Sequence, residues 1–258
     1  MNPSLSFDIL RLPNIVVKSY FCRPGETDKI ALVYETSAGL HRPLLELIEG
    51  PDLRNFSLGT RYRLASNLAE CVFFLHLTGL LHKGIRSDNV LLSGSQKDEC
   101  IYSDLKLHLV GFNTARLDQQ GEISEKVEVD AHAELYHHID YQRSKKNDVD
   151  YTRGYDIYSL GVVLLEIGLW HPVKKIGRYD SGNYNAIAFA SRLQKKRLLD
   201  NLNFTAGSAY RRAVEWCLKG PFEEVQGQVP FKNLPSEKQS MGFWDHVVLE
   251  LAKCSVPE

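Results

Sequence analysis

One apolar stretch limits the possible folds of this chain more than any other feature. The segment YDIYSLGVVLLEIGLW, residues 155–170, places apolar side chains on nearly every face of a helix. Such a helix is buried inside a domain or crosses a membrane. The stretch is too short to cross a membrane, it contains Glu166, and the N-terminus lacks a signal-peptide pattern. We therefore expect the buried central helix of a cytoplasmic protein that neither crosses a membrane nor is secreted.

Size and charge fit a soluble protein with one large domain or, less well, two small ones. The chain has 258 residues and a formal net charge of -1, so the protein as a whole would not attract nucleic acid or an anionic membrane. The basic runs RSKKND and LQKKRLLD are interspersed with acids and indicate solvated faces. The five cysteines are scattered, without the spacing of a zinc site or the density of a disulfide scaffold, which favours a reducing compartment.

The first half of the chain predicts two strand pairs around one helix. NIVVKSYFC and KIALVYE are rich in β-branched and aromatic residues, and the turn sequence RPGETD between them predicts a hairpin. From Arg61 apolar residues recur at helical spacing, which predicts an amphipathic helix that ends near Gly79. NVLLS and LKLHLVGF predict a second pair of short strands.

The second half predicts a long loop followed by helices. The stretch from Asn113 to Thr152 is polar and without sustained periodicity, which is typical of a long functional loop. Beyond the central helix we expect further helices over 185–199, 209–218 and 243–254. Strands followed by helices alone predict an α+β domain with a mostly helical body.

Several motifs occur in an order that resembles the eukaryotic protein kinase family, over about residues 13–218. They are LPNIVV, ALVYE, LLHKGIRSDNVLL, HLVGFNTAR, YHHIDY, the central helix and YRRAVEWCLKG. The resemblance implies a kinase-like large lobe over residues 39–258. Residues 1–38 then correspond to a truncated small lobe, which retains the fourth and fifth strands and the hinge. The residues of the later motifs, YHHIDYQ and YDIYSLGVVLLEIGLWHP, are similar to those of kinase-like proteins of filamentous fungi.

The resemblance also identifies two positions where catalytic carboxylates are missing. Kinases have His-Arg-Asp in the catalytic loop, whose Asp accepts the substrate proton, and here that Asp position is Gly84. Their Asp-Phe-Gly motif holds magnesium through its Asp, and here that position is Gly111. Asn89 matches the second metal ligand and is retained, but one neutral amide is a poor magnesium site. We expect no catalytic residues and no metal.

The phosphate-binding half of a kinase is missing from the pattern as well. No glycine-rich loop precedes residue 50, and Lys18 of IVVK lies too near the hinge to be the catalytic lysine. We interpret Lys18 as a solvent-facing residue of the fourth strand. Together with the lost carboxylates this argues against ATP and magnesium, so no cofactor is expected.

Other matched positions have structural roles in the family. His82 and Phe112 correspond to residues of a packed column that the central-helix Asp156 anchors, and their retention is expected in an inactive fold. Asp140 matches the glutamate that closes the activation segment by pairing with an arginine, and no such arginine is evident after CLKG. Leu91 and Val163 match positions under the adenine ring, although buried aliphatic residues are also ordinary core residues.

The histidines His132, His137 and His138 could indicate a metal site. They lie in the predicted loop without a partnering cysteine or carboxylate pattern. A metal site is therefore not predicted there.

The sequence thus favours a catalytically inactive kinase-like domain, a pseudokinase, that binds a protein partner or an upstream segment of its own chain in signalling. One alternative is a divergent ATP-dependent protein kinase in which Asp88 or another carboxylate substitutes for the missing ones. Another is a truncated fragment of a longer kinase-like protein. Because an isolated hairpin is marginal, its uncovered edge and apolar face, with Val17 and Leu32 among the candidates, also predict self-association.

Overall fold

The computed structural model describes most of the chain. The described residues are 16–22, 30–35, 40–50, 56–94, 105–118, 131–144, 151–179 and 185–254.

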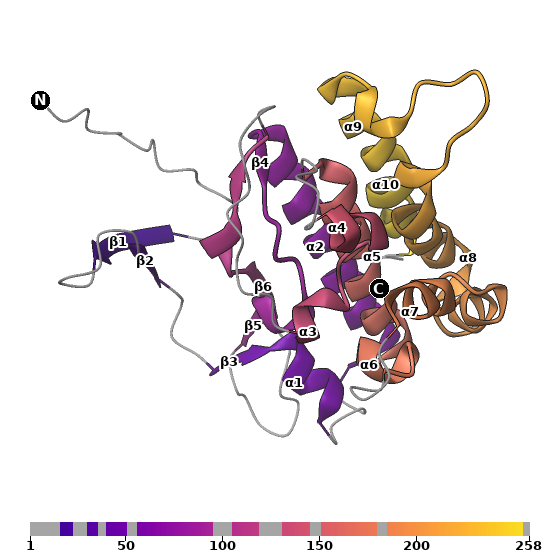
Figure 1. Ribbon diagram of the computed structural model, residues 1–258. Coiled ribbons are helices and arrows are strands. Elements are labelled where there is room, and N and C mark those ends of the chain that lie inside the picture. Colours follow the sequence, from indigo (N-terminus) through magenta and orange to yellow (C-terminus); the bar gives the residue numbers. More distant parts are fainter. Residues whose placement is uncertain are drawn as a thin grey trace, which may run out of the picture.

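The N-terminal hairpin predicted from the sequence is confirmed. Strands β1 (Val16–Cys22) and β2 (Ile30–Glu35) pair antiparallel. Their register shifts between Val17 and Ser19, as at a β-bulge. Within the described residues these two strands form a sheet of their own, which stands to one side of the helical body in Figure 1.

A second, three-stranded sheet contains the other predicted strand pair. Strand β5 (Val90–Gly94) lies between β3 (Leu40–Pro43) and β6 (Lys106–Leu109), antiparallel to both. The strands β4 (Leu80–Leu81) and β7 (Arg116–Leu117) form a further short pair. The sequence pattern missed β3, β4 and β7 because two to four residues are too few to show a period of two.

Two helices follow from local signals around residue 50. The short α1 (Leu44–Glu49) leads from β3, and the long α2 spans Leu58–Leu77. Helix α2 begins earlier than its apolar pattern because the Ser57 Oγ accepts a hydrogen bond from the Thr60 amide at 3.1 Å. It ends before Gly79, whose φ of +74° favours glycine.

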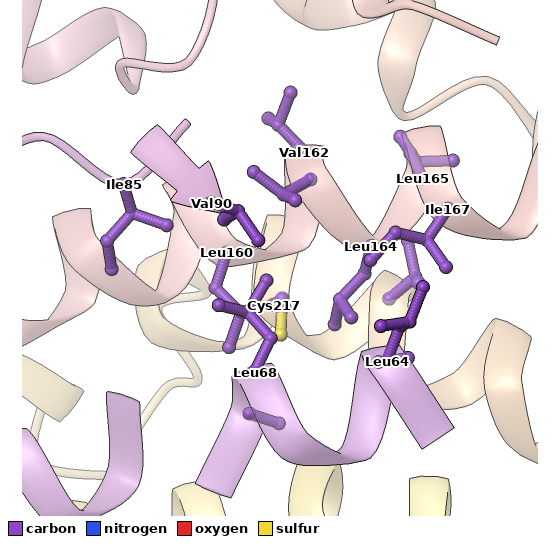
Figure 2. Packing of buried hydrophobic residues seen from close by; sticks show 14 of the residues in the cluster. Leu64, Leu68, Ile85, Val90, Leu160, Val162, Leu164, Leu165, Ile167 and Cys217 are labelled. Atoms are coloured by element: carbon purple, nitrogen blue, oxygen red, sulfur yellow. The ribbon is translucent and has the colours of Figure 1, made fainter. Parts of the chain in front are cut away.

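Helix α5 (Arg153–Leu169) is the buried central helix that the sequence predicts. Every residue from Arg153 to Gly168 is buried. Figure 2 shows Leu160 and Leu164 of α5 above Leu64 and Leu68 of α2, whereas Val162 points away from α2. The main hydrophobic core therefore surrounds most of α5, while Tyr155 near its start belongs to a second cluster with Leu81 and Tyr151.

Glycines on α5 allow helix α8 (Lys196–Lys219) to approach closely. A Cβ at Gly161 would lie 2.6 Å from the Cβ of Cys217, and one at Gly168 would lie 2.6 Å from Leu202 Cδ1. The two glycines are seven residues apart and so lie on one face of α5. Helix α8 is interrupted at Gly207, which has a φ of 79° and a ψ of 166°.

The prediction of a long loop from Asn113 to Thr152 is partly wrong. Inside it lie the short helices α3 (Ala131–Glu134) and α4 (Ile139–Ser144), which are too short to produce a recognisable helical period. The prediction for the rest of that stretch falls largely outside the described residues. The helix expected over 185–199 is also divided, because α7 (Ala186–Leu193) ends at Gln194 and α8 begins at Lys196.

The remaining helices complete a mostly helical body. They are α6 (Val173–Ile176), α9 (Ser236–Phe243), a π-helical turn over Trp244–Val248 and α10 (Leu249–Ala252). The fold is therefore α+β, with small antiparallel sheets beside a helical body, as expected (Figure 1). Among the described helices, none combines the length and the apolar character that a membrane crossing requires.

Candidate functional site

The candidate site is the loop from His82 to Asn89, and a buried carboxylate holds its first residues. The Asp156 side chain is fully buried at the start of α5. It accepts hydrogen bonds from the amides of His82 at 2.7 Å and Lys83 at 2.9 Å, and from the Tyr151 hydroxyl at 2.8 Å. His76 Nε2 lies 3.2 Å from the same carboxylate. Asp156 thus fixes the loop to the central helix.

These contacts keep Asp156 ionised inside the core. Burial by itself would raise the pKa of Asp156, but the hydrogen bond from His76, the nearby histidines and the His82 amide outweigh burial and hold this pKa below its usual value. A buried charge with four donors is stable, whereas removal of the charge would leave buried donors unpaired.

His82 and Phe112, which the resemblance pairs in one column, lie against each other. Their ring centroids are 4.5 Å apart with an interplanar angle of 56°. Burial lowers the pKa of His82 to about 4, so the imidazole is neutral at physiological pH. Its Nδ1 accepts a hydrogen bond from the Gly84 amide at 3.2 Å. His82 therefore acts as a packing residue that shapes the loop.

Gly84, Asn89 and Gly111 meet at the tip of the loop. The Asn89 Nδ2 donates to the Gly84 carbonyl at 2.8 Å. A Cβ at Gly111 would lie 2.5–2.8 Å from the amide group of Asn89, and Gly111 has a φ of +86°. A Cβ at Gly84 would have its nearest neighbours at 3.4–3.5 Å, which is ordinary contact. The Asn89 amide thus occupies the space into which a side chain at position 111 would extend.

The carboxylate that remains in this loop is engaged elsewhere. The Arg86 Nε lies 3.0 Å from Asp88 Oδ1, and both side chains are partly exposed. The ion pair holds Asp88 to Arg86. The loop tip itself, formed by two glycines and an asparagine, presents neutral groups.

The residues at the tip do not fit a magnesium ion. Magnesium prefers several oxygen ligands in octahedral geometry, usually with one or two carboxylates. Here Asn89 contributes an amide, and its Nδ2 already bonds the loop carbonyl. Among the described residues there is no group of three or more His, Cys, Asp or Glu side chains that could hold a metal ion.

The candidate adenine positions lie in two different environments. Leu91 is half-buried on strand β5. Val163 has no exposed surface and belongs to the main hydrophobic core around α5. The packing role of Val163 in this core is sufficient to account for its residue type.

A second buried carboxylate, missed as a site by the sequence reasoning, lies near the other end of α5. The Tyr136 hydroxyl donates to both oxygens of Glu166, at 3.0 and 3.2 Å, and the Val173 amide donates to Oε1 at 2.7 Å. The Ser87 hydroxyl of the loop lies 2.8 Å from the Tyr136 hydroxyl. Burial raises the pKa of Glu166 to about 8. The position of an acidic residue, Glu166, inside an otherwise apolar helix was the feature of the sequence that could have revealed this site.

The histidines of the predicted loop contact aromatic rings. His132 packs edge-on against Tyr136, and His137 packs in the same way against Tyr141. His138 stacks on Phe222 with ring centroids 3.8 Å apart and an interplanar angle of 2°. These contacts explain the histidines as packing residues.

Asp140 makes no arginine pair within the described residues. Its side chain is 60% exposed, and its carboxylate lies 3.6 Å from His138 Nδ1. The stacked pair of His138 and Phe222 occurs where the family resemblance places the segment-closing ion pair.

Two contacts join the residues on either side of the segment 119–150. The Arg153 Nε donates to Asp118 Oδ2 at 2.6 Å. The Arg116 Nη2 donates to the Tyr151 carbonyl at 2.9 Å. The two ends of this segment are therefore held together at the start of α5.

Comparison with protein-family models gives no match, but three proteins of Arabidopsis thaliana resemble part of the chain. The leaf rust 10 disease-resistance locus receptor-like protein kinase-like 1.4 is 27% identical over 163 residues, which is 61% of this chain and 22% of that protein. The similarly named protein 1.2 is 26% identical over the same shares. The serine/threonine/tyrosine-protein kinase HT1 is 26% identical over 155 residues, or 60% of this chain and 35% of that kinase.

The relatives, the sequence motifs and the fold all point to a likeness to protein kinases. All three are named as kinases or as kinase-like, and all are plant proteins, so the finer resemblance to fungal proteins has no support in them. The match spans only 22% of the length of each receptor-like relative. Together with the ordered motifs and the α+β architecture, these likenesses support a protein-kinase-like domain in this chain.

Proposed function

We propose that this chain is a catalytically inactive kinase-like domain, a pseudokinase, that acts by binding another protein. The observation that supports this most is the neutral tip of the loop, where the Asn89 amide bonds the Gly84 carbonyl and fills the space beside Gly111. A phosphoryl-transfer site needs a base for the substrate hydroxyl and a carboxylate for magnesium. Neither group is present at its matched position, because both positions are glycines.

The absence of these two groups should have a large effect on the rate of phosphoryl transfer. Phosphoryl transfer depends on positioning and on electrostatic stabilisation of the transition state. Loss of one such electrostatic element commonly lowers the rate on the order of 100-fold or more. Two losses, at Gly84 and Gly111, should leave no measurable transfer.

The test is phosphate transfer from labelled ATP with magnesium or manganese, to the protein itself and to generic substrates. The HT1 kinase provides the positive control. We expect no incorporation, and no rise of the melting temperature with ATP concentration, because a ligand that binds the native state raises it. The double variant Gly84→Asp/Gly111→Asp should also be silent, because the sequence pattern lacks the glycine-rich loop and the catalytic lysine, and because the Asn89 amide would have to move to admit a side chain at position 111.

A divergent ATP-dependent kinase is the second candidate. The kinase names of the relatives and the partly exposed Asp88 carboxylate favour it. Incorporation of phosphate by the wild type that disappears in Asp88→Asn, with an unchanged melting temperature, would establish this function and refute the first proposal.

The partner proposal rests on the hairpin β1–β2. Within the described residues this sheet has two strands, and an isolated hairpin is marginal in water. We expect an upstream segment, another protein or a second copy to add a strand to its edge. Hydrogen exchange should show weak protection of the hairpin in the monomer and strong protection in the complex. A monomer whose hairpin exchanges as slowly as α5 would contradict this proposal.

A further inference from the structure

A pocket lies between helices α2, α5 and α9, away from the loop tip but next to His76, which contacts Asp156. Its volume is about 520 Å³, within the range of ligand and peptide-anchor pockets. One wall is formed by the last turns of α2, through Phe73 and Leu77. The opposite wall is formed by one face of α9 and the π-helical turn after it, through Met241 and Trp244.

The walls present apolar groups to solvent. Met241 is 63% exposed, Leu77 is 54% exposed and Trp244 is 36% exposed. Phe73 contacts the Trp244 ring, with centroids 4.9 Å apart, and so joins the two walls at the base. Exposed apolar surface that continues into a pocket is typical of an interaction site.

The backbone of the second wall has an unusual conformation. Residues Trp244–Val248 form a π-helix, and the Leu249 amide bonds the Trp244 carbonyl five residues earlier. Such turns are rare and occur frequently at functional sites. This observation is independent of the apolar exposure and concerns the same wall.

The charges around the pocket are predominantly acidic. Arg153 at its base is neutralised by Asp118 at 2.6 Å, and Arg153 Nη1 also bonds the Ser240 hydroxyl at 3.2 Å. Glu237 and Asp245 also line the pocket, and within the described part of the chain neither carboxylate forms an ion pair or a hydrogen bond. An occupant that carries positive charge therefore complements the pocket.

We propose that this pocket binds a protein segment that presents an apolar side chain next to an arginine or lysine. The apolar side chain packs between Leu77 and Met241. The cation lies by the Trp244 ring and pairs with Glu237 or Asp245, and arginine suits this site because it combines stacking with forked hydrogen bonds. This inference deepens the proposed binding function and rests on it, since it names the kind of partner.

The experiment is selection of random 16-residue peptides displayed on phage against the whole protein. Binding of the enriched peptides is then measured by fluorescence anisotropy. We expect the enriched sequences to combine an apolar residue with arginine or lysine within one helical turn. Met241→Glu should weaken their binding about tenfold or more, as expected for a central apolar contact.

Two further variants separate the contributions. Glu237→Lys/Asp245→Lys should weaken binding several-fold, by an amount that shrinks as salt rises from roughly 50 mM to 500 mM because surface charges are screened. The matched control is Phe204→Glu, which introduces the same charge at a 90% exposed residue of α8 outside the pocket. It should leave binding unchanged.

The outcomes distinguish this inference from the proposed function. No enrichment, enrichment of acidic peptides, or binding that Met241→Glu leaves intact would overturn the pocket proposal, whatever the phosphate-transfer assay shows. Phosphate transfer by the same preparation would overturn the proposed function while selective binding at the pocket still stood. Met241 is largely exposed, so equal melting temperatures of Met241→Glu and the wild type are expected and exclude misfolding as the cause.

Discussion

A carboxylate is buried near each end of α5, and the pKa values of the two are shifted in opposite directions. At the start, Asp156 is ionised, with its pKa held below the usual value. Near the end, burial raises the pKa of Glu166 to about 8, so this side chain holds a proton at neutral pH. Both residues are fully buried on one helix.

The difference lies in the donors that surround each group. Asp156 receives two backbone amides, a tyrosine hydroxyl and a histidine. Among the described residues, Glu166 receives one amide, one tyrosine hydroxyl that spans both of its oxygens and the Ser87 hydroxyl, but no histidine. Burial therefore does not decide ionisation alone; the number of donors and the proximity of histidines decide whether a buried acid keeps its charge.

The largest expected effect is at Asp156. Asp156→Ala should lower the free energy of unfolding by about 3 kcal/mol or more, because several buried donors lose their acceptor. Asp156→Asn keeps the shape and one acceptor oxygen, so it should cost less. Denaturant unfolding of both variants provides the measurement. Wild-type stability in Asp156→Ala would mean that the loop around His82 does not depend on α5.

The next effect depends on pH and concerns Glu166. Its folded-state pKa of about 8 lies above the unfolded value of 4.5, so the folded state retains the proton between these values. The contribution of this bound proton to the free energy of unfolding is fully present below pH 4.5, and it is lost as the pH rises through about 8. Relative to wild type, Glu166→Gln should therefore gain roughly 1 kcal/mol per pH unit between about pH 5 and 8.

Urea unfolding of both proteins at several pH values tests this. A stability difference that stays constant from pH 5 to 8 would show that Glu166 is ionised throughout, and the contrast with Asp156 would disappear.

A smaller effect sharpens the comparison within the loop that Asp156 holds. Gly111→Ala should destabilise the protein by roughly 1–2 kcal/mol, because position 111 has a positive φ and the Asn89 amide lies in the way. Gly84→Ala is the matched control, and its Cβ would meet only ordinary contacts. Thermal unfolding should separate the two variants. Equal melting temperatures would remove the steric argument against a carboxylate at position 111.

The smallest effect removes one donor from Glu166. Tyr136→Phe deletes the hydroxyl that bonds Glu166 and Ser87, and should cost about 1 kcal/mol. With fewer donors, the pH at which Glu166 loses its proton should rise further. A downward shift of that pH would contradict the role assigned to the donors.

The sequence predicted the elements with strong periodicity and missed those that depend on tertiary contacts. The all-round apolar character of α5 and the β-branched runs of β1 and β2 needed no other part of the chain. By contrast, α3 and α4 are too short to show a period, and α8 carries a break at Gly207.

The same division holds for the candidate site. The order of the motifs predicts that Gly84 and Gly111 stand where kinases have carboxylates, and this stays a prediction. That the Asn89 amide fills the vacant space depends on the positive φ of Gly111 and on the approach of two separate loops. The pairing of Glu166 with Tyr136 joins residues 30 positions apart and has no local signal.

The contacts from Arg153 to Asp118 and from Arg116 to Tyr151 have a consequence for evolution. Because they hold the two ends of the segment 119–150 together, and the region of α3 and α4 inside it keeps its own contacts with the body, a longer segment costs the entropy of closing a loop in addition to any contacts that change. That entropy grows logarithmically, by roughly 0.6 kcal/mol for each doubling of length. Changes in the length of this segment that leave α3, α4 and the two contacts intact should therefore be tolerated better among homologues than substitutions at Arg153 or Asp118.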